Sequence, residues 1–513
     1  MTTTSTSWPL GHLFAHAARR WPDRACWTTV DGRSRTFAEV DERIDRICDA
    51  LTARGARKGD RVALLDTDSF AYAELLGACF KLGLTYVPVN YRLAPFEIEN
   101  VLGRARPGWF FVGERYLETA RKVLGTLPGE VRLWSLDGCL DDDVETLVAE
   151  GRPVPPEVRV EDDDVLGIMF TSGTTGLPKG VVQSARMLKT MLWMGGETAA
   201  RPGAVRYTAS PIFHIAGWAI VFNQVAHGAT SLIHPQFEPD VVARAISSGL
   251  LTGCFLVPTM IQQVMEADGG PGPGERLDTL LYGSAPMPPS LLRRALERWP
   301  SVDFYNLFGA GTESGLQTLL RPDDHRRALA GEEHLLASAG QPILGVDLRI
   351  LDDEGRPCPP GVVGNIAART DCVMDGYLDM ADLTTTALHD GYFWGGDRGW
   401  MDERGYLFLG GRSRDMIIRG GENIYVAEVE QVLTDVPGVA DAAVVGRPDE
   451  TWGEVVVAFV EHREQPAPTV EALEQMCRAR LASYKVPVEY HVLVELPRNP
   501  TGKVRKNELV ARL

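Results

Sequence analysis

A ten-residue segment rich in threonine, serine and glycine, Thr171–Gly180, has the composition of a loop that binds phosphate groups. Glycine lets the backbone approach an anion closely, while hydroxyl groups and backbone amides donate hydrogen bonds to phosphate oxygens. Lys179 adds a positive charge near the end of the segment. In the Walker P-loop the lysine is followed by serine or threonine, whereas Gly180 follows Lys179 here. We therefore predict a nucleotide polyphosphate site that is not of the Walker type.

The residues before this segment predict how it is positioned. Val165–Phe170 is short, apolar and preceded by the acidic run Glu161–Asp164, which is the pattern of a buried strand. Clusters of Gly, Ser and Thr are more often plain surface loops. The preceding strand and the Pro-Lys-Gly ending favour phosphate binding over that alternative.

The first half of the chain alternates helical and strand patterns. Arg61–Leu65 and Tyr86–Val89 are predicted strands, and Phe70–Leu82 is the predicted helix between them. This order predicts a layered α/β domain with a mainly parallel sheet. Around Val346–Asp352 and Gly364–Ala368 the pattern changes to short alternating strands, which predicts a smaller β-rich subdomain.

Glycine-rich segments mark the expected boundaries. Gly269–Gly274 is a predicted loop, and Gly410–Asp415 has the adjacent glycines and charges of a hinge centred on Arg414. The last hundred residues follow the order strand, helix, strand, strand, helix. We expect a large N-terminal domain over residues 1–413 and a small, mobile α+β domain over residues 414–513.

Size and charge restrict the class of protein. A chain of 513 residues is long enough for several domains, because single cores stop growing near ~250–300 residues. A net charge of -17 disfavours nucleic acid and anionic membranes as partners, since phosphate neutralisation needs clustered Lys and Arg. The partner is expected to be a small molecule.

Cysteine spacing and hydropathy bear on the compartment. The eight cysteines contain no Cys-x-x-Cys pair, so neither a zinc site nor a disulfide framework is expected. The sequence shows no signal-peptide pattern and no apolar run of about 18 residues. We expect a cytoplasmic protein without a membrane span.

Further motifs follow the phosphate-binding segment in a definite order. They are Ser210–Gly217, Tyr282–Pro286, Phe308–Glu313, Gly391–Asp397, Gly411–Glu428 and Pro497–Lys503. Together with Thr171–Gly180, they resemble the adenylate-forming superfamily, which includes acyl-CoA synthetases, luciferases and the adenylation domains of nonribosomal peptide synthetases. The resemblance extends from about residue 10 to the end of the chain.

The resemblance implies a two-step reaction. A carboxylate attacks the α-phosphorus of ATP to give an acyl-adenylate and pyrophosphate, and a second nucleophile then displaces AMP. A carboxylate with a pKa near ~4 is already ionised at neutral pH. The first step therefore needs no general base, but it needs charge neutralisation and in-line positioning because two anions must meet.

The resemblance also assigns catalytic roles to Lys503, Thr171, Glu313 and His214. Lys503 matches the lysine that bridges the carboxylate and the α-phosphate, although a lone C-terminal lysine is usually a solvated surface charge. Glu313 is expected to bind Mg²⁺, directly or through water. His214 matches an aromatic gate at the carboxylate site, and its ordinary alternative is a core histidine. No acid–base role is assigned to it.

Other motif residues are expected to contact the nucleotide. Ser284, Ala285 and Pro286 match one wall of the adenine site and Phe308 the other, while Asp397 and Arg412 match residues that bind the ribose. The full nucleotide set is Thr171, Ser172, Gly173, Thr174, Thr175, Lys179, Ser284, Ala285, Pro286, Asn306, Phe308, Thr312, Asp397, Arg412 and Lys503.

The acyl pocket is predicted from apolar and small residues near these motifs. The candidates are His214, Trp218, Val257, Met260, Leu307, Gly309, Ala310 and Gly311. They favour an aromatic or medium-chain apolar acid. The segment Phe308–Glu313 carries one residue more than the aromatic-Gly-x-Thr-Glu pattern of the superfamily, Gly395 replaces a common threonine, and Asn365 replaces a common glutamate.

The second nucleophile is predicted from the C-terminal motif. Ile418–Tyr425 resembles the acyl-CoA synthetase version, in which Gly420 and Gly421 would let the pantetheine arm of coenzyme A pass. Trp452 matches a residue at the CoA site or is a packing residue. We expect a stand-alone acid–CoA ligase, either monomer or homodimer. The alternatives are an adenylating enzyme that uses a carrier-protein thiol, an amine or another nucleophile, and a non-catalytic nucleotide-binding relative.

Overall fold

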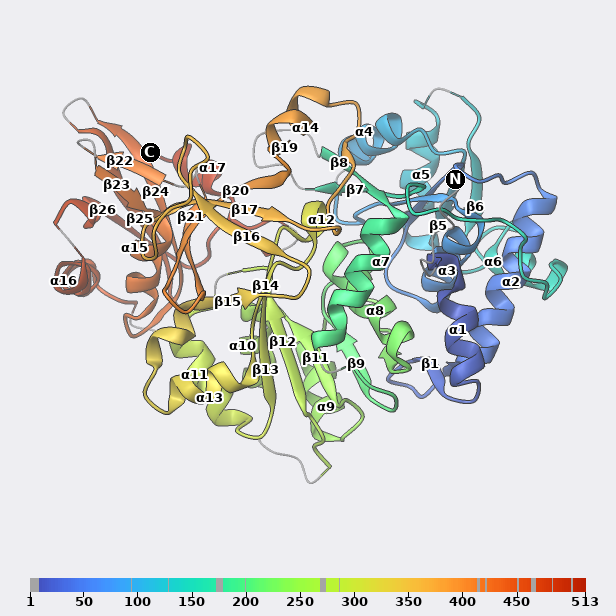
Figure 1. Ribbon diagram of the computed structural model, residues 1–513, viewed down its shortest axis with the longest axis horizontal. Coiled ribbons are helices and arrows are strands. Elements are labelled where there is room, and N and C mark those ends of the chain that lie inside the picture. Colours follow the sequence, from blue (N-terminus) through green and yellow to red (C-terminus); the bar gives the residue numbers. More distant parts are fainter. Residues whose placement is uncertain are drawn as a thin grey trace.

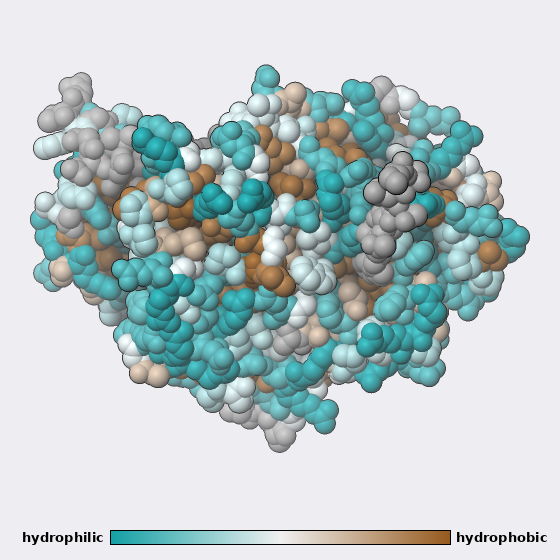
Figure 2. Space-filling model, in the orientation of Figure 1, coloured by the Kyte–Doolittle hydropathy of each residue, from teal (hydrophilic) through white to brown (hydrophobic). Residues whose placement is uncertain are grey.

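The computed structural model describes residues 9–93, 95–127, 129–171, 179–198, 200–267, 274–285, 287–412, 416–419, 422–449, 452–462, 467–481, 483–499 and 502–513. A large N-terminal α/β part carries the first sheets and most of the helices, and a small α+β part lies at one end of the molecule (Figure 1). This arrangement confirms the predicted fold class. Figure 2 shows a mainly hydrophilic face on which apolar residues gather towards the middle.

The first sheet has seven strands and carries the phosphate-binding segment. Its order is β6 (Arg132–Ser135), β5 (Trp109–Val112), β3 (Arg61–Leu65), β4 (Thr85–Pro88), β7 (Val165–Thr171), β8 (Lys179–Ser184) and β18 (Gly376–Tyr377). The strands from β6 to β7 are parallel, while β8 and β18 are antiparallel to their neighbours. The parallel sheet predicted from the sequence is therefore confirmed.

The second sheet is longer and changes character along its length. Its order is β2 (Ser34–Thr36), β1 (Ala25–Thr28), β10 (Thr230–Leu232), β9 (Val205–Thr208), β11 (Gly253–Leu256), β12 (Thr279–Gly283), β13 (Asp303–Phe308), β14 (Thr318–Leu320), β15 (Ser338–Pro342), β21 (Leu407–Arg412), β20 (Tyr392–Met401), β17 (Gly364–Arg369) and β16 (Asp347–Leu351), with β19 (Leu388–His389) beside β20. Pairing is parallel from β1 to β13 and antiparallel from β13 to β16. The antiparallel end is the predicted β-rich subdomain.

Helices cover both sheets and fill the space between them. The inner layer consists of α1 (Leu13–Arg20), α2 (Phe37–Ala53), α3 (Phe70–Leu82), α7 (Ala185–Met194) and α8 (Ile215–His227), with α6 (Val144–Glu150) against α2. The outer layers are α4 (Pro95–Ala105) and α5 (Leu117–Leu124) on the first sheet, and α9 (Pro239–Ser247), α10 (Pro258–Ala267), α11 (Pro289–Arg298) and α13 (Pro322–Leu329) on the second. Two short helices, α12 (Gly311–Ser314) and α14 (Ala381–Ala387), lie in connections.

Two inner helices begin beside the site because of their capping residues. The Ser69 hydroxyl accepts a hydrogen bond from the backbone N–H of Tyr72 and starts α3, which confirms the predicted helix. His214 Nδ1 accepts from the N–H of Ala216 and starts α8. Such caps satisfy backbone donors that have no partner within the helix.

The C-terminal part is a five-stranded sheet with helices on both faces. Its strands are β22 (Met416–Arg419), β23 (Glu422–Tyr425), β24 (Val439–Asp449), β25 (Gly453–His462) and β26 (Glu489–Leu493). Helices α15 (Val426–Thr434) and α16 (Val470–Arg480) pack on one face, and α17 (Lys506–Val510) on the other. The sequence pattern predicted fewer elements here: β22 and β23 form a tight hairpin, and β26 has too many polar residues to stand out.

Part of the predicted hinge segment Gly410–Asp415 belongs to a strand. Gly411 and Arg412 belong to strand β21, where they pair with Arg398 and Asp397 of β20. Residues 413–415, including Arg414, lie outside the described residues, so the division at residues 413 and 414 stays a prediction. Most of the predicted loop Gly269–Gly274 also lies outside them.

Two simpler expectations concern the membrane and the cysteines. Within the described ranges, no helix is both long and apolar enough to cross a membrane. The eight cysteines are free thiols, and most of them are buried.

Candidate active site

The predicted site residues follow the carboxyl ends of four neighbouring parallel strands. His214 comes after β9, Val257 after β11, Ser284 after β12, and the segment from Gly309 after β13. Ligands of open α/β sheets bind at this edge, where connecting loops can reach outward. The order of the strands therefore brings together residues from segments nearly a hundred positions apart.

The first sheet presents its own carboxyl edge to the same place. The carboxylate of Asp68, which follows β3, accepts a hydrogen bond from the backbone N–H of Ile212 at 2.9 Å. Ile212 lies two residues before His214, in the connection after β9. This hydrogen bond fastens the two sheets together beside the predicted carboxylate site.

The phosphate-binding segment forms the connection of a hairpin between β7 and β8. Thr171 pairs with Lys179 at its base, and the connection between them contains Ser172, Gly173, Thr174 and Thr175, which lie outside the described residues. The Lys179 ammonium lies 5.4 Å from the ring centre of Tyr377, within the range of a cation–π contact.

A network of backbone bonds ties this hairpin to the turn that carries Glu313. Gln183, fully buried on β8, donates through Nε2 to the carbonyl of Thr312 at 3.0 Å. Met374 N–H donates to the carbonyl of Glu313 at 2.7 Å, and Leu378 N–H donates to Gly180 at 2.7 Å. The phosphate-binding hairpin and the acid-bearing turn therefore form one unit.

The extra residue in the segment Phe308–Glu313 is absorbed by close backbone packing. A Cβ atom at Gly309 would lie 2.1 Å from the carbonyl oxygen of Gly315, so only glycine fits there. At Gly311, a Cβ atom would lie 2.9 Å from Cγ2 of Ile215, the residue after His214. The inserted segment therefore reaches the start of α8.

The two predicted ribose residues are brought together by strand pairing. Asp397 on β20 lies directly opposite Arg412 on β21, although fourteen positions of sequence separate them. The structure describes the strand position of Arg412 but not its side chain. The pairing places the Asp397 carboxylate in the β-rich subdomain, next to the site.

The predicted adenine residues lie at the ends of adjacent strands. Gly283 pairs with Leu307, and Ser284 follows with φ +64°, a conformation that few residues other than glycine adopt. Ser284 and Ala285 are exposed, while Pro286 lies outside the described residues. The Asn306 amide donates to Ser338 O at 3.4 Å.

His214 is neutral at pH 7 and has a defined tautomer. Burial lowers the pKa of its imidazole to about 4, and the positive charges of Arg92 and Lys503 act in the same direction. The N–H of Ala216 points at Nδ1, so the proton is assigned to Nε2; the Ser210 hydroxyl lies 3.2 Å from the same Nδ1. A neutral, oriented ring suits binding and not proton transfer.

The predicted acyl-pocket residues do not all face one space. Val257, Leu307 and Ala310 are partly buried beside the inner core. Trp218 is fully buried among aromatic side chains of that core, so its ring is not on an open pocket wall. Met260 packs against the apolar cluster on the outer face of the second sheet. The assignment of Trp218 and Met260 to the acyl pocket therefore gains no support from their packing and stays a prediction.

Lys503 lies beside the antiparallel bridge between Arg498 and Val504, and residues 497–499 and 502–505 are here called the lysine hairpin. The N–H of Asn499 donates to Lys503 O at 2.8 Å, and the N–H of Lys503 donates to the Asn499 side chain at 2.9 Å. Gly502 has φ +83° and closes the turn. The Lys503 side chain is exposed, and its positive charge helps to lower the pKa of His214.

The residues predicted for the second half-reaction are only partly described. Gly420 and Gly421 lie outside the described residues. Trp452 is half exposed, and the Arg419 guanidinium lies 5.5 Å from the centre of its ring. This Arg–Trp pair borders the predicted glycine passage.

The side chains of the site suit a Mg²⁺ ion that is held mainly by a nucleotide. In the part of the chain that the structure describes, no group of three or more His, Cys, Asp or Glu side chains could hold a metal. Mg²⁺ commonly takes one or two carboxylates together with phosphate and water oxygens. A single carboxylate, Glu313, next to the phosphate-binding hairpin fits that requirement.

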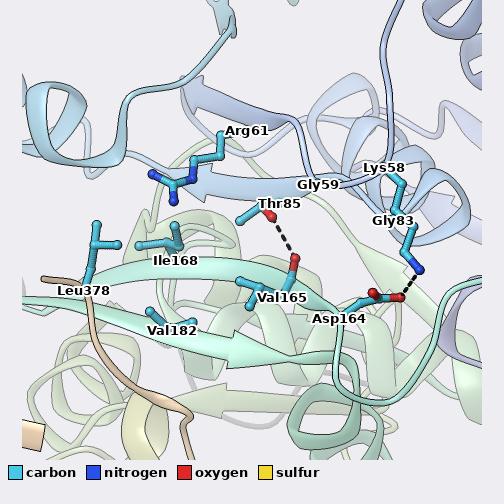
Figure 3. Close-up of a pocket in the computed structure, with 10 residues that line it drawn as sticks. All are labelled: Lys58, Gly59, Arg61, Gly83, Thr85, Asp164, Val165, Ile168, Val182 and Leu378. Carbon is cyan, nitrogen blue, oxygen red and sulfur yellow. Dashed lines mark hydrogen bonds and ion pairs between the residues drawn. The ribbon is translucent and has the colours of Figure 1, made fainter. Parts of the chain in front are cut away.

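One cavity in the N-terminal part does not coincide with these residues. It has a volume of about 230 Å³ and lies where Arg61, Thr85 and Val165 begin β3, β4 and β7, towards the amino ends of parallel strands (Figure 3). Lys58 and Asp164 in its wall form an ion pair at 2.6 Å. The active site is therefore not assigned to it.

Sequence reasoning missed several residues of the site. Four residues near the site belong to no recognised motif, and each interacts with a residue from a distant segment of the chain. They are Asp68, Arg92, Gln183 and Tyr377. Gln183 lies outside the strands that the sequence predicted, so its place on β8 came from the structure. Asp68 follows the predicted strand Arg61–Leu65 after two residues, which could have drawn attention to it.

Comparison with known proteins agrees with this geometry. The family described as "AMP-binding enzyme" matches residues 14–378, and the "AMP-binding enzyme C-terminal domain" matches residues 428–503. The chain belongs to the AMP-binding enzyme family. It is therefore an adenylate-forming ligase that uses ATP and Mg²⁺.

Individual relatives cover nearly the whole chain. A feruloyl-CoA synthase of Amycolatopsis sp is 34% identical over 99% of this chain and 98% of its own length. A fatty acid–acyl-carrier-protein ligase, ScoC of Streptomyces coeruleorubidus, is 33% identical over 93% of this chain and 92% of its own. This chain is thus similar both to a ligase named for coenzyme A and to a ligase named for an acyl-carrier protein.

Among solved structures, the o-succinylbenzoate CoA synthetase of Bacillus subtilis with its acyl-adenylate intermediate superimposes with a TM-score of 0.84. The identity is 29%, and the match covers 98% of both chains. This agreement confirms that the family fold extends through both the large and the small part.

Proposed function

We propose that the protein is an acid–CoA ligase that adenylates a carboxylic acid and then transfers the acyl group to coenzyme A. The observation that carries this proposal is the convergence of His214, Ser284 and Gly309 after the carboxyl ends of neighbouring parallel strands. Lys503, which matches the superfamily lysine, adds a positive charge that helps to lower the pKa of His214.

The chain's own residues account for the needs of the first step. Lys503 neutralises charge where the substrate carboxylate meets the α-phosphate, and Lys179 neutralises charge at the polyphosphate. His214, neutral and oriented by Ala216 N–H, limits the space around the carboxylate without removing a proton. Asp397 accepts hydrogen bonds from the ribose. Glu313 would hold Mg²⁺, which would supply further neutralisation of phosphate charge.

The acid is proposed to be apolar. Val257, Leu307 and Ala310 are apolar, partly buried and packed against the inner core. Gly311 removes one side chain from the space beside Ile215. These features favour an aromatic or medium-chain apolar acid over a small dicarboxylate.

Coenzyme A is the favoured acceptor because of the segment around Gly420 and Gly421, and because of relatives such as the feruloyl-CoA synthase. The competing proposal is a carrier-protein thiol, which the similarity to ScoC favours. An amine is the third possibility.

Pyrophosphate release across a panel of carboxylic acids tests the first step. With the best acid, product masses are then compared for coenzyme A, a holo-carrier protein and a simple amine. A CoA thioester formed at least about tenfold faster than the other products supports the proposal. Faster loading of the carrier protein would show that the acceptor is a carrier-protein thiol and not coenzyme A. If no acid led to pyrophosphate release, the adenylation step would be rejected.

A further inference from the structure

We propose that Arg498 is a positioning residue that holds the lysine hairpin, and so sets where the Lys503 ammonium lies during adenylation. This inference rests on the proposed function, because it concerns the group that serves its first step. Arg498 does not touch the substrate. It acts through the backbone of Gly502.

The contacts of Arg498 extend in two directions. Its NH2 nitrogen lies 2.7 Å from a carboxylate oxygen of Asp441 and 3.0 Å from one of Glu461. Its NH1 nitrogen donates to the carbonyl of Gly502 at 3.0 Å, next to Lys503. One planar guanidinium therefore connects the rigid sheet to the hairpin that carries the lysine.

On the sheet, Arg498 contacts two acidic residues that lie directly opposite each other, which is an unusual arrangement. Asp441 on β24 and Glu461 on β25 are direct cross-strand partners. Like charges directly opposite each other destabilise a sheet. Here the guanidinium lies between them, and Glu461 also accepts from the N–H of Leu496 at 3.0 Å. The acid pair thus fixes the position of Arg498.

The electrostatics agree with a permanently charged clamp. Partial burial alone would lower the pKa of Arg498, but the hydrogen bonds and charges of Asp441 and Glu461 outweigh it and raise the pKa. The side chains of all three residues are only about a fifth to a third exposed, at 21%, 32% and 20%. Limited exposure reduces competition from water and keeps the guanidinium in one place.

The hairpin is short, so a fixed Gly502 carbonyl fixes the next residue. Asn499 bonds both the N–H and the carbonyl of Lys503 from the opposite side. Without the Arg498 bond, the Gly502 carbonyl loses a direct hydrogen bond to a side chain that is itself held by the sheet. Displacement of a catalytic group by about 1 Å can cost on the order of 10²-fold in rate.

Arg498→Gln and Arg498→Lys test this inference in the full-length protein. For Arg498→Gln, we expect pyrophosphate release to slow by about 10- to 100-fold, with the KM for ATP changed less than about threefold. Thioester formation from a pre-made acyl-adenylate should stay within about twofold of wild type, since Lys503 serves only the first step. Arg498→Lys keeps the positive charge but lacks the two separate NH groups of the guanidinium. It should therefore recover only part of the rate of pyrophosphate release.

A double variant separates positioning from independent action. If Arg498 acts through Lys503, then Arg498→Gln combined with Lys503→Ala should be no slower than Lys503→Ala alone. Additive losses would overturn the proposal, and so would an equal fall in both half-reactions. Arg480→Ala, which removes a surface ion pair with Asp435 in the same domain, is the matched control and should leave both half-reactions unchanged.

Hydrogen exchange gives a readout that does not depend on activity. Arg498→Gln should speed amide exchange at Asn499 and Lys503 while β24 and β25 keep their protection, and unchanged exchange at the hairpin would overturn the clamp. This measurement applies even if wild-type protein releases no pyrophosphate, a result that would reject the proposed function alone. If Arg498→Gln does not fold, the same measurements are made with Arg498→Lys.

Discussion

The ammonium of Lys503, near the C-terminus, and the imidazole of His214, in the middle of the chain, come from distant segments, yet the charge of Lys503 contributes to the low pKa of His214. Burial is the larger cause, and Arg92 adds to it. The Lys503 charge therefore acts on His214, which follows strand β9. In the proposed mechanism, adenylation needs Lys503 at this edge of the sheet, whereas attack by a second nucleophile needs it elsewhere.

The first prediction follows from this proximity. Lys503→Ala should slow pyrophosphate release by on the order of 10²-fold or more, because one preorganised positive charge is lost. Thioester formation from a pre-made acyl-adenylate should remain largely intact. The two half-reactions are measured separately, and undiminished pyrophosphate release in the variant would remove Lys503 from the mechanism.

The second prediction concerns ribose recognition by Asp397. Charge-assisted hydrogen bonds contribute roughly 1.5–3 kcal/mol each, so Asp397→Ala should raise the KM for ATP by at least about tenfold. Wild-type kinetics with ATP and 2′-deoxy-ATP provide the control. Equal kinetics with the two nucleotides would count against a ribose contact at this position.

The third prediction is a change of stability with pH through Asp68. Burial raises the pKa of Asp68 to about 7, despite the opposing N–H of Ile212 and charge of Arg92. A carboxyl with a raised pKa in the folded state binds more protons there than when unfolded between about pH 4 and 7. Its contribution to stability therefore improves as the pH falls through 7 and worsens as the pH rises.

Asp68→Asn removes this titration while keeping an oxygen that can accept from Ile212. Relative to wild type, the variant should be more stable at pH 8 than at pH 5.5, with a difference of about 2 kcal/mol between the two. Urea unfolding at both pH values measures it. The exposed Asp382→Asn should show no such difference, and a pH-independent effect of Asp68→Asn would contradict a buried, titrating carboxyl.

The fourth prediction tests rotation of the C-terminal part. Lys503 must leave the site before a thiol can enter beside Gly420, and the connection between β21 and β22 is the place for that turn. Arg414→Pro fixes φ and restricts Ser413, so it should slow thioester formation far more than adenylation. Arg414→Lys is the control. Wild-type rates for both half-reactions in Arg414→Pro would reject a rotation about this residue.

The fold followed from local patterns where those patterns were strong. The helix Phe70–Leu82 and the strand Arg61–Leu65 have the bounds that the sequence predicted, because apolar periodicity and a serine cap act over a few residues. Gly411 looks flexible in the sequence but pairs with Arg398 of strand β20, while residues 413–415 of the predicted hinge lie outside the described residues. Pairing with a distant strand overrode the local preference.

The sequence by itself determined the chemistry that the protein can offer: a hydroxyl- and glycine-rich phosphate loop, a motif lysine, and single acids for metal and ribose. These depend on residue type and near spacing, which are local properties. Only the tertiary structure decided that Trp218 belongs to the core, that Asp68 holds Ile212, and that Arg498 lies between Asp441 and Glu461. Such neighbours are set by strand order and register, and no spacing along the chain encodes them.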